Sequence, residues 1–441
     1  MPDKPVAPQL TGPQIRDALQ QFLNEGGSDL GEAGGKVVEL LTQGNVQMMH
    51  PGYFGLFNPS PTFPGIVADL ITATLNPQLA TWSHAPAAVE IEAFTIAEVG
   101  GWIGWGADET AGHFTSGGSE ANYTAVLAAL TRSCPSFASK GARALTGQPR
   151  LYASMESHLA WLKIAHQAGI GRDAVCLVST DGKGRMDVGQ LEAMIENDRR
   201  AGEVPFLICA TAGTTNAGMI DPLQVMSDVA RRYSCWFHVD AAWGGAALID
   251  PEMHAYFNGI AASDSVTIDA HKWLSVPMGA GMFLCRDNAL LRRTFDVTAS
   301  YMPAHAVEGV DPYTHSAQWS RRFIGLKLFL SLAVLGRSGY RDHIRRTCSL
   351  AEYLRRQLVA DHWRILNESP LGVVCFAPPD DRIPLGDIAA AVVERGRSWI
   401  SAARFEGKEV LRACITGHSS REAHVDRLIE DLRTARSDAS A

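Results

Sequence analysis

The sequence lacks the features that mark exported, metal-binding or membrane-spanning chains. Its eight cysteines are scattered, with neither a Cys-x-x-Cys pair nor the Cys/His spacing of a zinc site, which disfavours a disulfide framework and a structural metal. No segment approaches the roughly 18 uninterrupted apolar residues of a membrane span, and the first twelve residues hold no apolar core of a signal peptide. We therefore expect a soluble protein of the reducing cytoplasm that uses no metal.

A long run of charge of one sign is also missing. The net charge of −8 is spread along the chain, so nothing points to nucleic acid or to an anionic membrane as a partner. Internal repeats and low-complexity tracts are absent too. A small molecule is the partner that the composition favours.

A repeated strand, turn and helix pattern is present between residues 86 and 340. Apolar, β-branched runs alternate with Gly/Ser/Thr turns and amphipathic helices, which predicts an α/β domain built on a mostly parallel sheet. The 441 residues, 46% of them hydrophobic, suffice for a large core. Strands are expected at residues 151–154, 174–178, 206–211, 235–239, 265–268 and 281–285.

Two smaller units are expected to flank this large domain. Residues 1–85 mix short helical patterns with Pro/Gly-rich stretches, which is typical of an extended arm that covers a partner subunit. Residues 341–441 predict a small C-terminal α/β domain, entered through helical stretches at 325–335 and 340–358 and closed by a helix at 420–436. Residues 299–320 are long, of mixed polarity and rich in His, Pro and Gly, which favours a lid.

A lysine follows the apolar strand near residues 265–268, in the sequence Asp-Ala-His-Lys-Trp. Burial makes an amine a better nucleophile toward an aldehyde, which is the chemistry that holds pyridoxal 5′-phosphate (PLP) as a Schiff base. Lys272 is therefore the predicted cofactor lysine, and Asp269 and His271 are cofactor-binding candidates beside it. The alternative is a lysine whose stem lies along the surface while its amine stays in water.

A carboxylate ends another apolar strand, in the sequence Trp-Phe-His-Val-Asp-Ala-Ala. Ligands bind at the carboxyl ends of strands in open α/β sheets, and PLP needs an anion beside its pyridine nitrogen to keep the ring protonated. Asp240 fits this role, and the small Ala242 leaves room for a flat ring. A helix N-cap or a surface carboxylate is the alternative for Asp240.

Three further segments supply cofactor candidates. The turn that contains Gly117, Gly118 and Ser119 leads into a helix, whose exposed N–H groups suit a phosphate; an ordinary helix entry looks the same. His158 follows a strand and is a candidate to lie flat over the pyridine ring, although a lone histidine is more often structural. Thr214 ends another strand, where it either bonds the cofactor, orients Asp240 or merely closes a turn.

Two residues are candidates to select the reaction. The alternation around Arg412 places its guanidinium on a strand face, where burial demands an anion such as a substrate α-carboxylate; an interdomain salt bridge is the alternative. Tyr313, within the expected lid, is a candidate acid that returns a proton to the substrate carbon. Tyrosines in mobile loops often have no chemical role, and the alternative is that Tyr313 takes no part in the reaction.

Taken together, these segments resemble the group II PLP-dependent amino-acid decarboxylases, the fold-type I family of the glutamate and aromatic L-amino-acid decarboxylases. The resemblance covers nearly the whole chain and rests on five motifs in family order. It implies a large PLP domain, a small C-terminal domain and an N-terminal arm that builds a homodimer in which both subunits line the active site. The motifs are residues 114–121, 157–158, 211–215, 238–245 and 271–273.

The resemblance also implies which residues contact the substrate. Ala80 stands where the aromatic branch carries a large apolar residue, and Trp243-Gly244-Gly245 is more similar to the glutamate and diaminobutyrate branch. A polar or acidic substrate side chain is therefore favoured over an aromatic one. The candidate contacts other than Arg412 are Asn58, Ser60, Gln78, Ala80, His84 and Trp243.

The reaction that the resemblance implies is decarboxylation of an L-amino acid to an amine. Oxidative deamination to an aldehyde and carbon–carbon lyase chemistry use the same scaffold and remain open. A catalytically silent PLP-binding dimer is the reading that is not an enzyme, and the clustering of reactive groups at Lys272, Asp240 and His158 argues against it.

Overall fold

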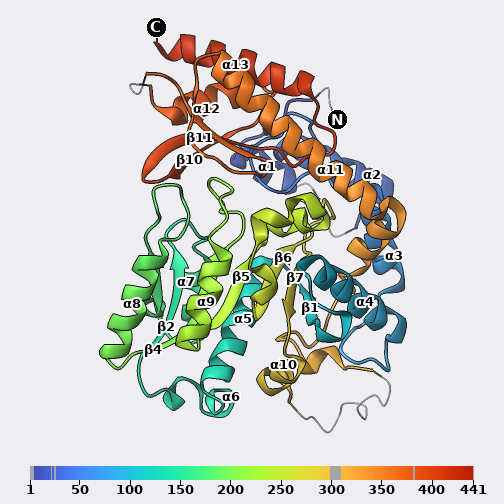
Figure 1. The fold of residues 1–441 in the computed structure, drawn as a ribbon. Helices are drawn as coiled ribbons and strands as arrows, with labels where there is room; N and C mark the ends of the chain where they lie inside the picture. The colour runs from blue at the N-terminus through green and yellow to red at the C-terminus, as the bar shows by residue number, and fades with distance from the viewer. Residues whose placement is uncertain (1–3, 21, 24–25, 298–308, 381–382, 441) are drawn as a thin grey trace.

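The computed structural model describes residues 4–20, 22–23, 26–297, 309–380 and 383–440 (Figure 1). Two sheets organise the chain, a large one in the middle of the sequence and a small one near its end. Within the described residues, no helix is both long and apolar enough to cross a membrane.

The large sheet has seven strands in the order β1-β7-β6-β5-β4-β2-β3. Neighbouring strands from β6 to β3 are parallel, and β7 runs antiparallel to both β1 and β6. This confirms the mostly parallel α/β sheet. The strands are β1 (Ala111–Thr115), β2 (Pro149–Ser154), β3 (Val175–Val178), β4 (Val204–Thr211), β5 (Trp236–Asp240), β6 (Ser265–Asp269) and β7 (Gly281–Cys285).

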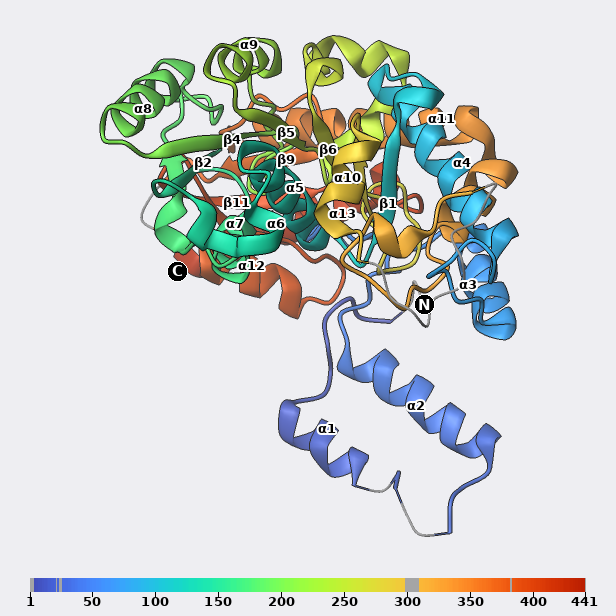
Figure 2. The same ribbon diagram turned by 90° about the horizontal axis from the view of Figure 1, so that it is seen from below.

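Helices cover both faces of this sheet. In Figure 2, α8 (Val188–Arg200) and α9 (Leu223–Tyr233) lie on one face, and α5 (Gly118–Ser133), α6 (Phe137–Lys140) and α7 (Ala160–Gln167) lie on the other. Local signals set several helix starts: the Asp187 and Asp287 carboxylates accept backbone N–H groups at the starts of α8 and α10 (Asn288–Phe295). The strands of the sheet are almost fully buried between these layers.

The small domain is an antiparallel sheet in the order β10-β11-β9-β8, packed against helices. It is reached through α11 (Leu326–Ala360), in which Gly336 has a φ of 68° and separates the two helical stretches that the sequence predicts. The division at residue 340 falls inside α11, so the domain limits remain a prediction. The other elements are β8 (Arg364–Ile365), β9 (Val373–Ala377), α12 (Leu385–Glu394), β10 (Ser401–Phe405), β11 (Lys408–Cys414) and α13 (Glu422–Ser440).

The first part of the N-terminal segment stands away from the rest of the chain. Figure 2 shows α1 (Gly12–Leu19) and α2 (Leu30–Gly44) standing away from the body, whereas α3 (Phe63–Leu75) and α4 (Pro86–Ile103) pack on it. Neither α1 nor α2 buries a single residue within this chain. Leu23 and Leu30 are 93% and 86% exposed, so the arm presents apolar surface that the chain itself leaves uncovered.

The expected lid at 299–320 is only partly supported. Residues 299–308 lie outside the described residues. The rest folds onto the body: the Tyr313 N–H donates to the Ala80 carbonyl at 3.1 Å, and the Trp82 N–H donates to Asp311 Oδ1 at 2.8 Å. Residues 311–314 are buried in this contact, so this part of the segment is a fixed wall rather than a lid.

Candidate active site

A cavity of about 490 Å³ opens at the carboxyl ends of β5 and β6, beside the start of α5. This is the edge at which α/β sheets bind their ligands. The chain brings eleven of the predicted site residues to its wall. They are Asn58, Gly117, Gly118, Ser119, His158, Asp240, Ala242, Trp243, Asp269, His271 and Lys272.

Asp240 is the last residue of β5 and is 6% exposed. One carboxylate oxygen accepts the Ala242 N–H at 3.1 Å, and the other accepts the side-chain amide of Asn122 at 2.8 Å. Two hydrogen bonds do not use all the lone pairs of a carboxylate, so Asp240, which lines the cavity, can accept a further donor from a ligand.

Lys272 lies just beyond β6, with its amine 3.0 Å from Asp269 Oδ2. The side chain is 23% exposed and the carboxylate 2%, so the pair sits at the cavity floor. The other Asp269 oxygen has no hydrogen-bond partner within the described part of the chain. A buried carboxylate oxygen without a donor is costly, and it marks the place where a ligand group or water is expected.

His271 is held between the same elements. Its Nδ1 accepts the Ala280 N–H at 3.1 Å, and its Nε2 lies 3.8 Å from Asp269 Oδ2. Burial lowers the pKa of His271, so the ring is neutral near pH 7 and carries its proton on Nε2. His271 therefore lies beside the Asp269 carboxylate and next to Lys272 in the sequence.

The turn before α5 forms a close-fitting cup. A Cβ at Gly118 would lie 2.9 Å from Asp269 Oδ2, so only glycine allows the turn to approach β6 this closely. The first N–H groups of a helix have no acceptor within the helix. The Ser116 N–H is already taken by the Glu120 carboxylate at 2.8 Å, which leaves the following amides for an anion.

Aromatic side chains form the wall opposite the sheet. Trp243 stacks on Trp273 with ring centroids 4.9 Å apart, and Phe57 tilts against Trp243 at 4.7 Å. The Trp243 indole N–H is buried without an acceptor within the described residues. His158 completes the wall, and its Nδ1 accepts the Ala160 N–H at 3.1 Å.

Thr214 does not reach the cavity, which corrects the prediction that it bonds the cofactor or Asp240. Its side chain is fully buried, and Oγ1 accepts the Met219 N–H at 3.0 Å while its own N–H donates to the Met219 carbonyl at 2.8 Å. Thr214 closes a turn. Thr211 and Thr215, on either side, line the cavity instead.

Arg412 lies just behind the wall and is 5% exposed. Its guanidinium donates to Ser401 Oγ at 3.1 Å, to the Thr215 carbonyl at 2.8 Å and to the Gly55 carbonyl at 3.3 Å. All three acceptors are neutral oxygens, and no ion pair of Arg412 is found among the described residues. The alternative of an interdomain salt bridge is therefore not what the described structure shows.

Five predicted residues are not brought to the cavity by one chain. Ser60 is buried beside His418. The other four gather elsewhere: the Gln78 carboxamide accepts the Ala80 N–H, and the Ala80 carbonyl accepts the Tyr313 N–H. Tyr313 is 4% exposed and packs against Trp319, so within its own subunit it does not reach Lys272. The residues outside the cavity wall are Ser60, Gln78, Ala80, His84 and Tyr313.

Sequence reasoning missed the residue that bonds Asp240. Asn122 lies in α5, is 3% exposed and touches the carboxylate directly. An amide on the buried face of a helix needs a partner, and this is the signal that points to it. The other lining residues outside the predictions are Leu56, Phe57, Ser116, Glu120, Thr211, Gly213, Thr215 and Met278.

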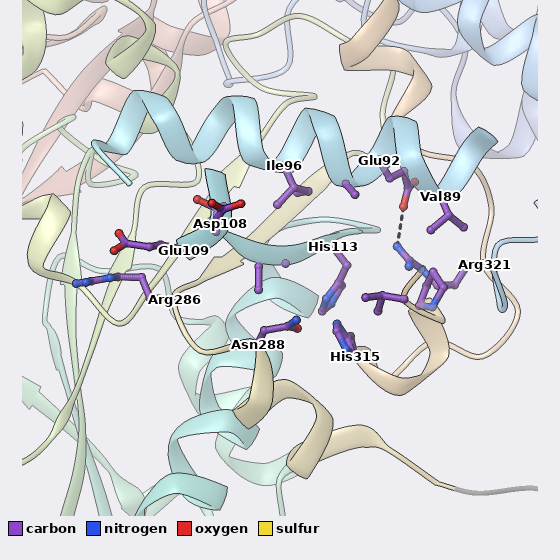
Figure 3. Close-up of a pocket in the computed structure, with 16 residues that line it drawn as sticks. Val89, Glu92, Ile96, Asp108, Glu109, His113, Arg286, Asn288, His315 and Arg321 are labelled. Carbon is purple, nitrogen blue, oxygen red and sulfur yellow. Dashed lines mark hydrogen bonds and ion pairs between the residues drawn. The ribbon is translucent and has the colours of Figure 1, made fainter. Parts of the chain in front are cut away.

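A second cavity of about 180 Å³ lies between α4, β1 and the segment that contains Val310, Pro312 and His315 (Figure 3). In the close-up His113 and His315 point toward one another, and the Arg321–Glu92 ion pair, 3.0 Å long, closes one end. Both nitrogens of His113 lack partners within the described chain. None of the predicted site residues lines this cavity.

The first cavity fits PLP. A lysine amine, a carboxylate with lone pairs toward the cavity and a helix N-terminus are the groups that a pyridine aldehyde phosphate requires. Asp269 also has a buried oxygen without a donor at the cavity floor. This fit to PLP depends on the residues of the cavity and does not depend on which substrate the enzyme uses.

Comparison with known proteins agrees with this fit. The sequence model described as "Pyridoxal-dependent decarboxylase conserved domain" matches residues 21–378. Over 378 residues the chain is 33% identical to human "Acidic amino acid decarboxylase GADL1", covering 83% of this chain and 72% of that protein. Over 424 residues it is 29% identical to the "Aromatic-L-amino-acid decarboxylase" of Bacillus atrophaeus, covering 93% and 86%.

Solved structures give the same result. The crystal structure of mouse CSAD superimposes with a TM-score of 0.92 at 28% identity, covering 99% of this chain and 94% of that one. The Rhodiola rosea 4-hydroxyphenylacetaldehyde synthase superimposes with a TM-score of 0.89 at 25% identity, covering 100% and 94%. The chain therefore belongs to the pyridoxal-dependent decarboxylase family and is a PLP-dependent amino-acid decarboxylase of the fold-type I architecture.

Proposed function

We propose that this enzyme removes the α-carboxylate of an L-amino acid with a polar or acidic side chain, with Lys272 as the cofactor lysine and Asp240 as the partner of the pyridine nitrogen. The observation that carries the proposal is the convergence of Lys272, Asp240 and the α5 turn on one cavity. When bound, PLP supplies an electron sink for the bond that breaks at the substrate α-carbon.

The residues around Lys272 prepare its amine. Asp269 Oδ2 lies 3.0 Å from the Lys272 amine, and the His271 ring lies 3.8 Å from the same oxygen. The amine must lose its proton before it attacks an aldehyde, and Asp269 keeps the side chain in place at the cavity until then. Asp240, bonded by Ala242 and Asn122, would accept a hydrogen bond from the protonated ring nitrogen of PLP.

Arg412 is proposed to bind the substrate α-carboxylate. A guanidinium has five N–H groups, and the three bonds to Ser401, Thr215 and Gly55 leave the others available. A buried arginine with only neutral acceptors retains its full charge for an incoming anion. Thr215 and Phe57, which contact Arg412 and also line the cavity, connect the two.

The side-chain preference rests on the polarity of the wall. Asn58, Thr211 and Thr215 offer hydrogen bonds, while Trp243 and Phe57 fill the space that a large aromatic substrate needs. The relative named as an acidic amino acid decarboxylase supports this choice. The relatives named for aromatic substrates are each 29% identical to this chain, and they support the alternative of an aromatic substrate.

We further propose a homodimer whose subunits complete each other's cavities. The arm residues of α1 and α2 are all unburied in one chain, and the residues Gln78, Ala80, His84 and Tyr313 gather away from the cavity of their own chain. Both facts are explained if the arm and this cluster meet a second copy. The cytoplasm is the proposed location, on the pattern of eight cysteines that are all free.

The test is product analysis of the purified enzyme with PLP. L-Aspartate, L-glutamate, L-tyrosine and L-tryptophan are offered separately, and carbon dioxide, amine, aldehyde and peroxide are measured. Amine and carbon dioxide in equal amounts from an acidic substrate support the proposal. Amine from only the aromatic substrates would contradict the side-chain preference, and aldehyde with peroxide would indicate the oxidative alternative that the Rhodiola rosea enzyme's name suggests.

Matched variants separate the residues. Lys272→Ala should lose the visible absorbance of bound PLP and about 10³-fold or more of the turnover, whereas Lys183→Ala, at an exposed ion pair, should behave as wild type. Arg412→Leu should raise KM for the amino acid with little change in PLP affinity. Normal KM in Arg412→Leu would remove Arg412 from the substrate site.

A further inference from the structure

A chain of buried side chains runs behind Asp240. Trp236 and His238 precede Asp240 on the same face of β5, and β6 places Ser265 opposite His238 and Thr267 opposite Asp240. α5 packs against these two strands and contributes Asn122. The five side chains behind Asp240 are at most 3% exposed: Trp236, His238, Ser265, Thr267 and Asn122.

The bonds follow one another without a gap. The Trp236 indole nitrogen lies 2.7 Å from Ser265 Oγ, which lies 2.8 Å from His238 Nδ1. His238 Nε2 lies 3.0 Å from Asn122 Oδ1, and the Asn122 amide nitrogen lies 2.8 Å from Asp240 Oδ2. Thr267 Oγ1 adds a second donor to Asn122 Oδ1 at 2.7 Å.

The direction of the chain follows from the partners of Ser265. An indole N–H can only donate, so Ser265 accepts from Trp236, and His238 Nδ1 is the partner left for the hydroxyl hydrogen of Ser265. The ring then carries its proton on Nε2 and donates to Asn122. The amide oxygen is thereby occupied, and the NH₂ group must face Asp240.

The opposite polarity leaves hydrogens without acceptors. If Asn122 turned its oxygen toward Asp240, the carboxyl group would need a proton, and Asn122 would donate to His238 and Thr267. Ser265 would then receive both the Trp236 and the His238 N–H, and its own hydrogen would have no acceptor among the hydrogen bonds of the described residues. Thr267 would have only the lone pair of His238 Nε2, 3.4 Å away, for which the Asn122 amide would compete. Burial also lowers the pKa of His238 to about 4, so a doubly protonated ring does not resolve the conflict near pH 7.

We infer that Asn122 and His238 are positioning residues whose directed hydrogen bonds hold Asp240 as a carboxylate with its free lone pairs toward the cavity. The inference rests on the proposed role of Asp240 beside the PLP nitrogen. His238 does not line the cavity, and Asn122, which does, is bonded to Asp240 through its amide, so both act on the carboxylate. A protonated Asp240 would present a donor where the pyridine nitrogen needs an acceptor for its own proton.

PLP affinity of the apoenzyme tests the inference, measured by quenching of protein fluorescence. Asn122→Asp replaces the donor to Asp240 by an acceptor of the same shape, and its Kd for PLP should rise about 100-fold. Thr124→Val is the control, because Thr124 is fully buried in the same helix but bonds only the helix carbonyl of Glu120. Asn122→Asp binding PLP as tightly as Thr124→Val would overturn the inference.

Two substitutions of His238 separate its hydrogen bond from its volume. The glutamine amide in His238→Gln can donate from the position of Nε2, so PLP affinity should stay within about threefold of wild type. His238→Leu fills the space without a donor and should bind PLP about tenfold more weakly. Equal losses in the two variants would show that packing alone is at work and would overturn the directed chain.

The wild-type apoenzyme supplies a measurement that needs neither a variant nor PLP. In protein labelled with ¹⁵N in its histidine rings, His238 should show a protonated Nε2 and an unprotonated Nδ1, assigned by the signal missing in His238→Gln. The opposite tautomer would overturn the inference even if PLP binds. If wild type fails to bind PLP, the proposed function falls, while the tautomer still decides the direction of the chain.

Discussion

Two buried histidines of the large sheet illustrate opposite solutions to the same problem. His238 on β5 is fully buried and has a partner at each ring nitrogen. His113 on β1 is 3% exposed and, within the described residues, has a partner at neither. Burial lowers the pKa of both rings, and nearby Arg321 and His315 lower that of His113 further.

The difference is that the His238 ring orients its neighbours through hydrogen bonds, whereas the His113 ring is buried without such a role. A satisfied buried network fixes rotamers and proton positions, which suits a group that must orient a carboxylate. An unsatisfied ring costs the free energy of its lost hydration and gains nothing in return. The second cavity owes its order to another contact, the buried ion pair of Arg321 with Glu92, which also anchors the start of α11 through the Ile324 and Gly325 N–H groups.

The largest effect is expected from breaking that ion pair. Arg321→Leu leaves Glu92 buried without its cation, although two backbone N–H groups remain on it. Loss of one partner of a buried pair costs about 3–5 kcal/mol of unfolding free energy. Burial already raises the pKa of Glu92, so part of the loss should be relieved by protonation below neutral pH. Urea unfolding at pH 7.5 measures the change.

The neighbouring residue gives the control. Arg322 pairs with Asp69 at 2.9 Å, but its side chain is 57% exposed. Exposed pairs contribute about 0–1 kcal/mol, so Arg322→Leu should hardly change the unfolding free energy. Equal losses in the two variants would mean that the arginine stem, and not the buried charge, stabilises this end of the cavity.

The second prediction compares the two histidines directly. His238→Leu removes a partner from both Ser265 and Asn122 and should cost about 2–3 kcal/mol of unfolding free energy. His113→Leu removes a ring without partners and should be neutral or stabilising by up to about 1 kcal/mol. A destabilised His113→Leu would show that ordered water or a ligand satisfies His113 and would break the contrast.

The third prediction concerns pH and uses His315, which faces His113 across the second cavity. Burial lowers the pKa of His315 to about 4, helped by Arg292 and Arg321 and opposed by Asp296. The unfolded chain, with an ordinary pKa near 6.5, binds the extra proton first. The unfolding free energy should therefore fall as pH drops from about 6.5 to 4, by about 1 kcal/mol per pH unit from this residue, and stay level above 6.5.

His315→Gln should flatten this slope in urea unfolding measured at several pH values. His166→Gln, at an exposed histidine of α7, should leave the slope as in wild type. An unchanged slope in His315→Gln would show that the ring is protonated and partnered in the folded protein, which would make the second cavity resemble the Asp240 network rather than contrast with it.

The sequence predicted the candidate site residues best where a strand ends in a single reactive side chain. Lys272, Asp240 and the Gly117-Gly118 turn follow from strand ends and a helix entry, because parallel strands place all such ends at one edge. Asn122 and Thr267 were missed because only the packing of α5 on β6 shows which helix and strand faces meet. β1 was missed because its sequence, Ala-Gly-His-Phe-Thr, carries a single β-branched residue.

The smallest effect on stability is expected from Thr214. This residue also shows that a position near a strand end does not by itself place a side chain in the cavity. Its hydroxyl accepts the Met219 N–H in a buried turn, so Thr214→Val should cost about 1 kcal/mol of unfolding free energy. PLP affinity should stay within about twofold, because no bond joins Thr214 to Asp240 in the described structure. Thr211, at the end of β4, and Thr215, in the turn, line the cavity instead. A tenfold weaker PLP affinity in Thr214→Val would mean that this turn transmits its order to Asp240, and the network behind the carboxylate would then extend onto β4.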